Sequence, residues 1–172
     1  MGALRLAIDV MGGDQGPRVI IEGSARAVIE RPDLELALFG PRQRVVAELS
    51  RLPQPLAAAA SRLVVCDAPD TVSQDASAAW ALRSGDKTSM VHMLRYVAQG
   101  YAAAGVSAGN TGALVALARR ELGMLPGFSR PAISTAIPAR GGRRCYLLDL
   151  GANVDSPASR LVDFAMMGAA MA

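Results

Sequence analysis

The sequence predicts an α/β fold of three layers, α/β/α, with helices on both faces of a mostly parallel sheet. Short apolar runs of strand length alternate with longer segments whose apolar residues recur at helical spacing. The strand-length runs are apolar throughout, as expected for parallel strands that are buried on both faces. Hydrophobic residues make up 51% of the 172 residues, enough for the core of one domain.

Helix and strand boundaries follow from proline, glycine and the spacing of apolar residues. Pro17 and Pro41 suit the first position of the first two helices, and Gly100 suits the end of the third. The polar stretch 69–89 is expected to be part loop and part helix, and 53–62 a loop or a short extra turn. The predicted strands are residues 4–10, 34–40, 62–68, 102–109, 132–138 and 145–153. The predicted helices are residues 17–30, 41–52, 90–100, 111–122 and 159–172.

The last predicted helix, 159–172, carries an apolar stripe but no glycine, proline or late cation that would end it. We therefore expect residues 1–172 to be the N-terminal part of a longer domain whose C-terminal part is absent.

Composition narrows the function classes. A net charge of +3, with no basic stripe interleaved with aromatic residues, argues against nucleic-acid binding. No apolar run approaches the ~18 residues of a membrane span. The apolar N-terminal run stops at Asp9, unlike a signal peptide, and the two cysteines make no disulfide framework. These features predict a cytoplasmic protein.

Glycine-rich polar loops follow several predicted strands. They are residues 9–17, 107–112, 138–142 and 149–156. In an open α/β sheet, ligands bind beyond the carboxyl ends of the strands, and a glycine-opened helix start offers free N–H groups to an anion. "SAGNTG" at 107–112 adds the side chains of Asn110 and Thr111, which predicts a phosphate cradle. The same residue types also serve as ordinary turns and helix caps.

At these loops the sequence resembles the PlsX family of bacterial phosphate acyltransferases. The matching segments are "AIDVMGGDQGP" at 7–17, "SAGNTGAL" at 107–114, "RPAI" at 130–133 and "LLDLGAN" at 147–153. "ALRSGDKTSM" at 81–90 is a weaker match: where the family has two basic residues and two serines, only Lys87 and Ser89 stand in the expected places. "FAMMG" at 164–168 is also weaker.

The resemblance implies a fold like those of isocitrate dehydrogenase and phosphotransacetylase, and a fatty acyl transfer from acyl carrier protein to inorganic phosphate. The product, an acyl phosphate, would feed phospholipid synthesis. The resemblance implies no cofactor for the transfer. It further implies a homodimer, and it leaves open a peripheral association with the inner face of the membrane. The candidate catalytic residues are Asn110, Thr111 and Arg130. The candidate substrate-binding residues are Asp9, Gly12, Gly13, Asp14, Ser107, Gly109, Gly112, Asp149, Gly151 and Asn153.

Several of these residues also fit a different role. Arg130 is as compatible with an exposed surface position as with anion pairing, and Asp9 and Asp149 either meet and orient the glycine loops or cap helices. The basic run 139–144 suits an acidic carrier protein or anionic lipid, although such runs are more often solvated faces. A transfer from acyl coenzyme A and a non-catalytic phosphate-binding fragment are the alternative functions.

Phosphate is already anionic at pH 7, so it can attack the thioester without a strong base. The thiolate leaves with little help from an acid. The reaction therefore does not require a nucleophilic side chain that forms a covalent intermediate. A Cys–His dyad would need His92, the only histidine, which lies in a helical pattern. Cys66 and Cys145 are expected to be small buried hydrophobes. The aspartates lack the spacing of metal ligands, so no metal is predicted.

Overall fold

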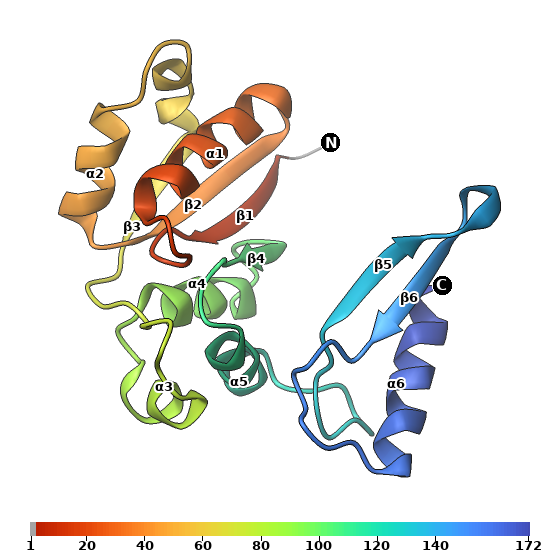
Figure 1. Ribbon diagram of the computed structural model, residues 1–172. Coiled ribbons are helices and arrows are strands. Elements are labelled where there is room, and N and C mark those ends of the chain that lie inside the picture. Colours follow the sequence, from red (N-terminus) through yellow and green to blue (C-terminus); the bar gives the residue numbers. More distant parts are fainter. Residues whose placement is uncertain (1–2) are drawn as a thin grey trace. The chain divides into compact units, whose positions relative to one another are not determined.

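The computed structural model describes residues 3–172, which form two compact units divided between Leu122 and Gly123 (Figure 1). The first unit holds the parallel sheet, and the second holds a β-hairpin with one helix. No helix among residues 3–172 is both long and apolar enough to cross a membrane.

The sheet of the first unit has four parallel strands in the order β3-β2-β1-β4. The strands are β1 (Leu4–Asp9), β2 (Leu34–Gly40), β3 (Leu63–Asp67) and β4 (Ala104–Val106). Because all four run the same way, the loops that follow them leave from one edge of the sheet. This arrangement confirms the predicted α/β class with a parallel sheet.

Helices cover both faces of this sheet (Figure 1). They are α1 (Pro17–Glu30), α2 (Arg42–Ser50), the 3-10 helix η1 (Leu56–Arg62), α3 (Ala78–Ser84), α4 (Ser89–Ala98) and α5 (Thr111–Leu122). The polar stretch 69–89 is part loop and part helix, as predicted, and 53–62 contains an extra turn, η1.

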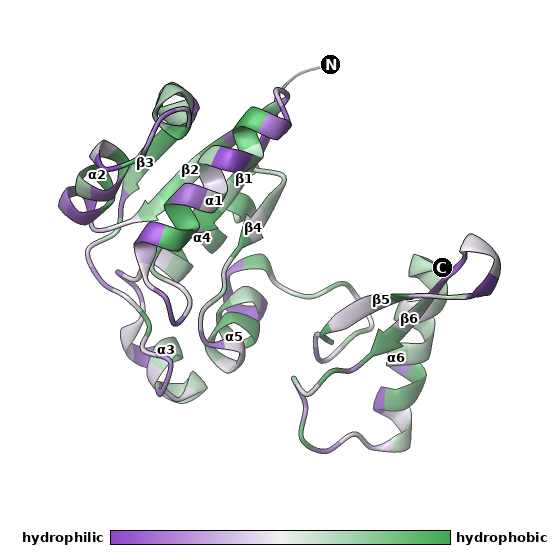
Figure 2. Ribbon diagram, turned by 45° about the horizontal axis from the view of Figure 1, so that its top comes forward, coloured by the Kyte–Doolittle hydropathy of each residue, from purple (hydrophilic) through white to green (hydrophobic). Residues whose placement is uncertain are grey.

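Alternation along the central strands builds two separate cores, because successive strand residues point to opposite faces. Ile8 and Leu38 pack with α1, α2 and η1 on one face. Ala7 and Phe39 pack with α4 and α5 on the other. The central strands β1 and β2 are coloured mostly hydrophobic in Figure 2, as burial on both faces requires.

The second unit pairs β5 (Ser134–Pro138) with β6 (Arg144–Leu148) in antiparallel register and packs α6 (Ala158–Met171) against β6. The predicted parallel sheet therefore does not include these two strands. The connection, residues 139–143, is too short for the crossover that parallel strands need. It turns through the 3-10 helix η2 (Arg140–Gly142), where Gly141 and Gly142 have φ of 75° and 73°.

Candidate functional site

Asp9, at the carboxyl end of β1, is the centre of the polar groups in the first unit. Its side chain is buried, at 2% exposure, and accepts two serine hydroxyls: Ser89 donates to Oδ1 at 2.6 Å and Ser107 to Oδ2 at 2.7 Å. The backbone N–H of Met11 donates to Oδ1 at 3.2 Å. Asp9 therefore ties together the end of β1, the start of α4 and the end of β4.

The two glycine loops of the first unit touch through backbone. A Cβ atom on Gly12 would lie 2.7 Å from the Gly109 nitrogen and 2.8 Å from Ser107 Oγ. Gly13 adopts φ of 98°, a conformation that favours glycine, and lies against Ala108. Segments 9–14 and 107–112 therefore meet at the carboxyl ends of β1 and β4.

The Ser107 side chain forms its hydrogen bonds with other groups of the protein. Its Oγ gives its only proton to Asp9 and accepts the Gly109 N–H at 3.1 Å. No hydroxyl proton is left for an anion, so in this geometry Ser107 orients the loop. The substrate-binding role predicted for it stays a prediction.

Asn110 has both ends of its amide occupied. Its Oδ1 accepts the Ala113 N–H at 2.9 Å and so caps α5. Its Nδ2 donates to the carbonyls of Gln74 at 2.7 Å and Ala76 at 2.8 Å, with that of Ser73 at 3.4 Å. The amide thus fastens loop 73–76 to the start of α5. This geometry makes Asn110 a positioning residue, and its predicted catalytic role stays a prediction.

The groups left open at this edge are mostly backbone. Thr111 and Gly112 are exposed and form the first turn of α5, where N–H groups have no acceptor within the helix. Asp14 is also exposed, in the loop after Gly13. The start of α5 therefore offers N–H donors and the partial positive charge of a helix N-terminus to an anion.

In the second unit, Asp149 organises a turn at the end of β6. Its carboxylate accepts the N–H of Ile133 at 2.9 Å, that of Asn153 at 2.8 Å and that of Ala152 at 3.3 Å. Burial by itself would raise the pKa of Asp149, but the Asn153 side chain and these N–H groups outweigh it and lower the pKa.

Three more predicted site residues belong to this unit. Asn153 Nδ2 donates to Asp149 at 2.8 Å and to the Pro131 carbonyl at 3.0 Å, Gly151 has φ of 93°, and Arg130 is exposed. Their predicted assembly with Asp9 and the glycine loops into one site stays a prediction, because the two sets belong to different units.

Two expectations about the second unit were wrong. Loops 138–142 and 149–156 do not share a sheet edge, because β5 and β6 are antiparallel and these loops leave from opposite ends of the hairpin. Cys145 was expected to be buried, yet it is exposed. Strand residues alternate between faces, and Tyr146 and Leu148 are the ones that line a pocket with α6. Cys66 is half-buried in β3, and burial raises the pKa of its thiol.

Ser89 is the site residue that sequence reasoning did not assign. It was recognised only as a remnant of a weaker family segment, and its partner Asp9 lies 80 residues away. The available signal was its place next to Thr88, whose side chain accepts the Val91 N–H and caps α4. Within residues 3–172, no group of three or more His, Cys, Asp or Glu side chains is arranged to hold a metal ion.

Comparison with known proteins shows the family of this chain. The profile of the family described as "Fatty acid synthesis protein" matches residues 4–172. The chain belongs to that family. It is 48% identical over 172 residues to the phosphate acyltransferase of Stutzerimonas stutzeri, 46% to that of Pseudomonas syringae pv. tomato and 42% to that of Vibrio cholerae. The alignments cover 100% of this chain and 47%, 49% and 50% of these relatives.

The resemblance seen at the glycine loops is thereby confirmed. The chain spans about half the length of the curated relatives it matches.

Proposed function

We propose that this chain is part of an acyltransferase that moves a fatty acyl group from acyl carrier protein to inorganic phosphate. The observation that carries the proposal is the backbone contact of Gly12 with Gly109, which holds two glycine loops together at the sheet edge where α5 begins. The names of the relatives, phosphate acyltransferase, supply the reaction class.

A phosphate oxygen attacks the carbonyl carbon of the thioester, the new C–O bond replaces the C–S bond, and the sulfur leaves as a thiolate. A thiol pKa of about 8.5 makes that thiolate a good leaving group, and it takes a proton from water afterwards. The protein's tasks are to hold phosphate against the carbonyl and to stabilise the oxyanion that forms. Neither task requires a nucleophilic side chain.

In this proposal the N–H groups of Thr111 and Gly112 hold the phosphate, with the Thr111 hydroxyl as a further donor. Asp9 serves as a positioning residue, because its oxygens are already filled by Ser89, Ser107 and Met11. Arg130, in the second unit, supplies a cation to the anion. Asp14, Asp149, Gly151 and Asn153 complete the proposed substrate site.

The partners in this proposal are acyl carrier protein and a second copy of the chain in a homodimer. The protein would act in the cytoplasm and associate peripherally with the inner face of the membrane. The basic run 139–144 is exposed at all six positions, which suits an acidic partner or anionic headgroups.

The test supplies acyl carrier protein thioester and phosphate, together and separately, and traps acyl phosphate with hydroxylamine. Acyl hydroxamate is expected only when both substrates are present. Arg130→Met should lower turnover, while Arg44→Met, at an exposed position of α2 outside the proposed site, serves as the matched control. Preference for acyl coenzyme A would favour the alternative donor. Phosphate binding without turnover would favour the non-catalytic alternative.

A further inference from the structure

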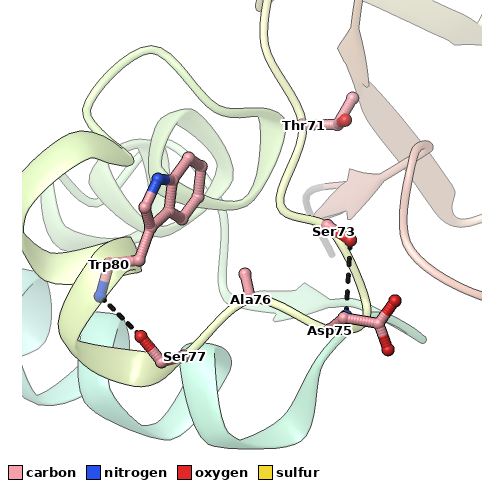
Figure 3. A pocket seen from close by; sticks show the side chains of 6 residues that line it. All are labelled: Thr71, Ser73, Asp75, Ala76, Ser77 and Trp80. Atoms are coloured by element: carbon pink, nitrogen blue, oxygen red, sulfur yellow. Dashed lines mark hydrogen bonds between the residues drawn. The ribbon is translucent and has the colours of Figure 1, made fainter.

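A depression of about 570 Å³ lies in the first unit, in the segment between β3 and α3 and the first turn of α3. Because this segment follows the carboxyl end of β3, it leaves from the same sheet edge as Asp9 and the 107–112 loop. We call it the Trp80 pocket. Its lining residues, drawn in Figure 3, are Thr71, Ser73, Asp75, Ala76, Ser77 and Trp80.

The wall of this pocket is held in place by hydrogen bonds. Ser77 Oγ accepts the backbone N–H of Trp80 at 3.1 Å, and Ser73 Oγ accepts the backbone N–H of Asp75 at 3.3 Å. The dashed lines in Figure 3 mark both hydrogen bonds. Asn110 Nδ2 donates to the Ala76 carbonyl at 2.8 Å. The pocket wall and the start of α5 are therefore fastened together through one side chain.

The chemistry of the lining favours a neutral ligand. The Trp80 side chain is exposed in part, at 38% for the residue, and offers a flat apolar surface. Thr71, Ser73 and Ser77 add hydroxyl groups, and the Asp75 carboxylate accepts N–H donors. None of the six lining residues is a lysine or arginine, and Asp75 repels anions, so phosphate is a poor ligand here.

We infer that the Trp80 pocket binds the neutral, amide-bearing pantetheine arm on which the acyl thioester is carried. The inference rests on the proposed function. Such an arm has methyl groups to lie against Trp80, amide N–H groups for Asp75 and amide carbonyls for the hydroxyls. With the arm there and phosphate at the N–H groups of Thr111 and Gly112, Asn110 marks the boundary between the two substrates. Acyl carrier protein and coenzyme A present the same arm.

Trp80 is the only tryptophan of the 172-residue chain, so its fluorescence reports on this pocket directly. We expect S-acetyl-pantetheine to change the emission saturably and inorganic phosphate alone to leave it unchanged. Acetyl coenzyme A and acyl carrier protein thioester, tested in parallel, show which source of the arm binds more tightly. A change with phosphate alone, or no change with any thioester, overturns the inference.

Variants separate the pocket from general effects. Asp75→Asn keeps one acceptor oxygen but removes the charge, so S-acetyl-pantetheine binding should weaken by about fivefold, the difference between a charge-assisted and a neutral hydrogen bond. Asp155→Asn, an exposed aspartate of the second unit, is the matched control and should bind as the parent does. Thr71→Val provides a second test at an exposed lining position if Asp75→Asn folds poorly, as a thermal melt would reveal. Unchanged binding in the well-folded variant contradicts the inference.

Failure here differs from failure of the proposed function. If acyl hydroxamate forms but Trp80 fluorescence and the pocket variants do not respond, the pocket is wrong and the acyltransferase stands. If the thioesters bind at Trp80 and no acyl phosphate forms, the pocket stands and the acyltransferase does not.

Discussion

Gly12 lies so close to Gly109 that no side chain fits between them: an added Cβ would sit 2.7 Å from the Gly109 nitrogen. The neighbouring atoms are a backbone amide, Ser107 Oγ and Asp9 Oδ2, none of which is the end of a long flexible chain. The glycine is required here by space, since Gly12 does not have the positive φ of Gly13. The two loops can therefore approach only as backbone against backbone.

Gly12→Ala should force these loops apart. We expect a loss of about 1–3 kcal/mol in the free energy of unfolding, the usual cost of overpacking. Phosphate-dependent turnover should fall by a larger fraction of its parental value than the free energy of unfolding does. Urea denaturation and the hydroxamate assay measure the two effects. Gly23→Ala is the control: Gly23 lies in α1 with open space around it, and the change should stabilise by about 0.5–1 kcal/mol. A Gly12→Ala protein with parental stability would contradict the close contact.

Asp9→Asn should loosen the same region by a different route. The amide keeps one acceptor oxygen, so one of the two serine hydroxyls loses its partner, which costs about 1–3 kcal/mol in a buried site. Ser107→Ala added to Asp9→Asn should cost less than the sum of the two single changes, because both act on the hydrogen bond between Ser107 and Asp9, whereas only Ser107→Ala also removes the acceptor of the Gly109 N–H. Chemical denaturation of the single and double variants measures this coupling. Asp33→Asn, which breaks only an exposed pair with Arg31, should leave the midpoint unchanged.

Much of the fold was predictable from local sequence. The strand runs around Ile8, Leu38 and Val65 are apolar, and proline marks the start of α1 correctly. Pro41 was expected inside α2 but lies one residue before it, at the N-cap. These features are local, since they depend on strand burial and on the missing N–H of proline.

The site depended on contacts that local patterns cannot supply. Ser89 reaches Asp9 from 80 positions away, and Asn110 reaches the Gln74 carbonyl from 36. The sequence identified Asp9 and Asn110 as polar residues near strand ends, and only the register of β1 with β4 brings Ser107 to Asp9. The antiparallel pairing of β5 and β6 was foreseeable from the short link 139–143, whereas the exposure of Cys145 required knowing which face α6 covers.

The stability of the second unit should fall in acid because of Asp149. Its pKa in the folded chain lies below that of the unfolded chain, so the ionised carboxylate stabilises the fold above about pH 4. That stabilisation is lost as pH falls from about 4 through the folded pKa. NMR titration of the Ile133 and Asn153 amides should follow the change. Asp149→Asn should flatten the pH dependence, and Asp155→Asn should retain it. An equally steep acid transition in Asp149→Asn would count against this assignment.

Asn110→Ser separates the two tasks of the Asn110 side chain. Serine caps a helix about as well as asparagine, so the cap at Ala113 should survive, and α5 should keep its protection from hydrogen exchange. Serine has no side-chain amide, so it cannot donate the two hydrogen bonds that Asn110 gives to the carbonyls of Gln74 and Ala76. The backbone amides of residues 73–77 should therefore exchange their hydrogens faster.

Asn110→Ala is the comparison, since it removes both tasks and should cost about 1 kcal/mol more through the lost cap. If Asn110 joins the pocket wall to the start of α5, both variants should weaken S-acetyl-pantetheine binding at Trp80, because the wall that holds the arm is no longer fastened. Parental binding in Asn110→Ser, together with faster exchange of 73–77, would show that the arm does not depend on this wall.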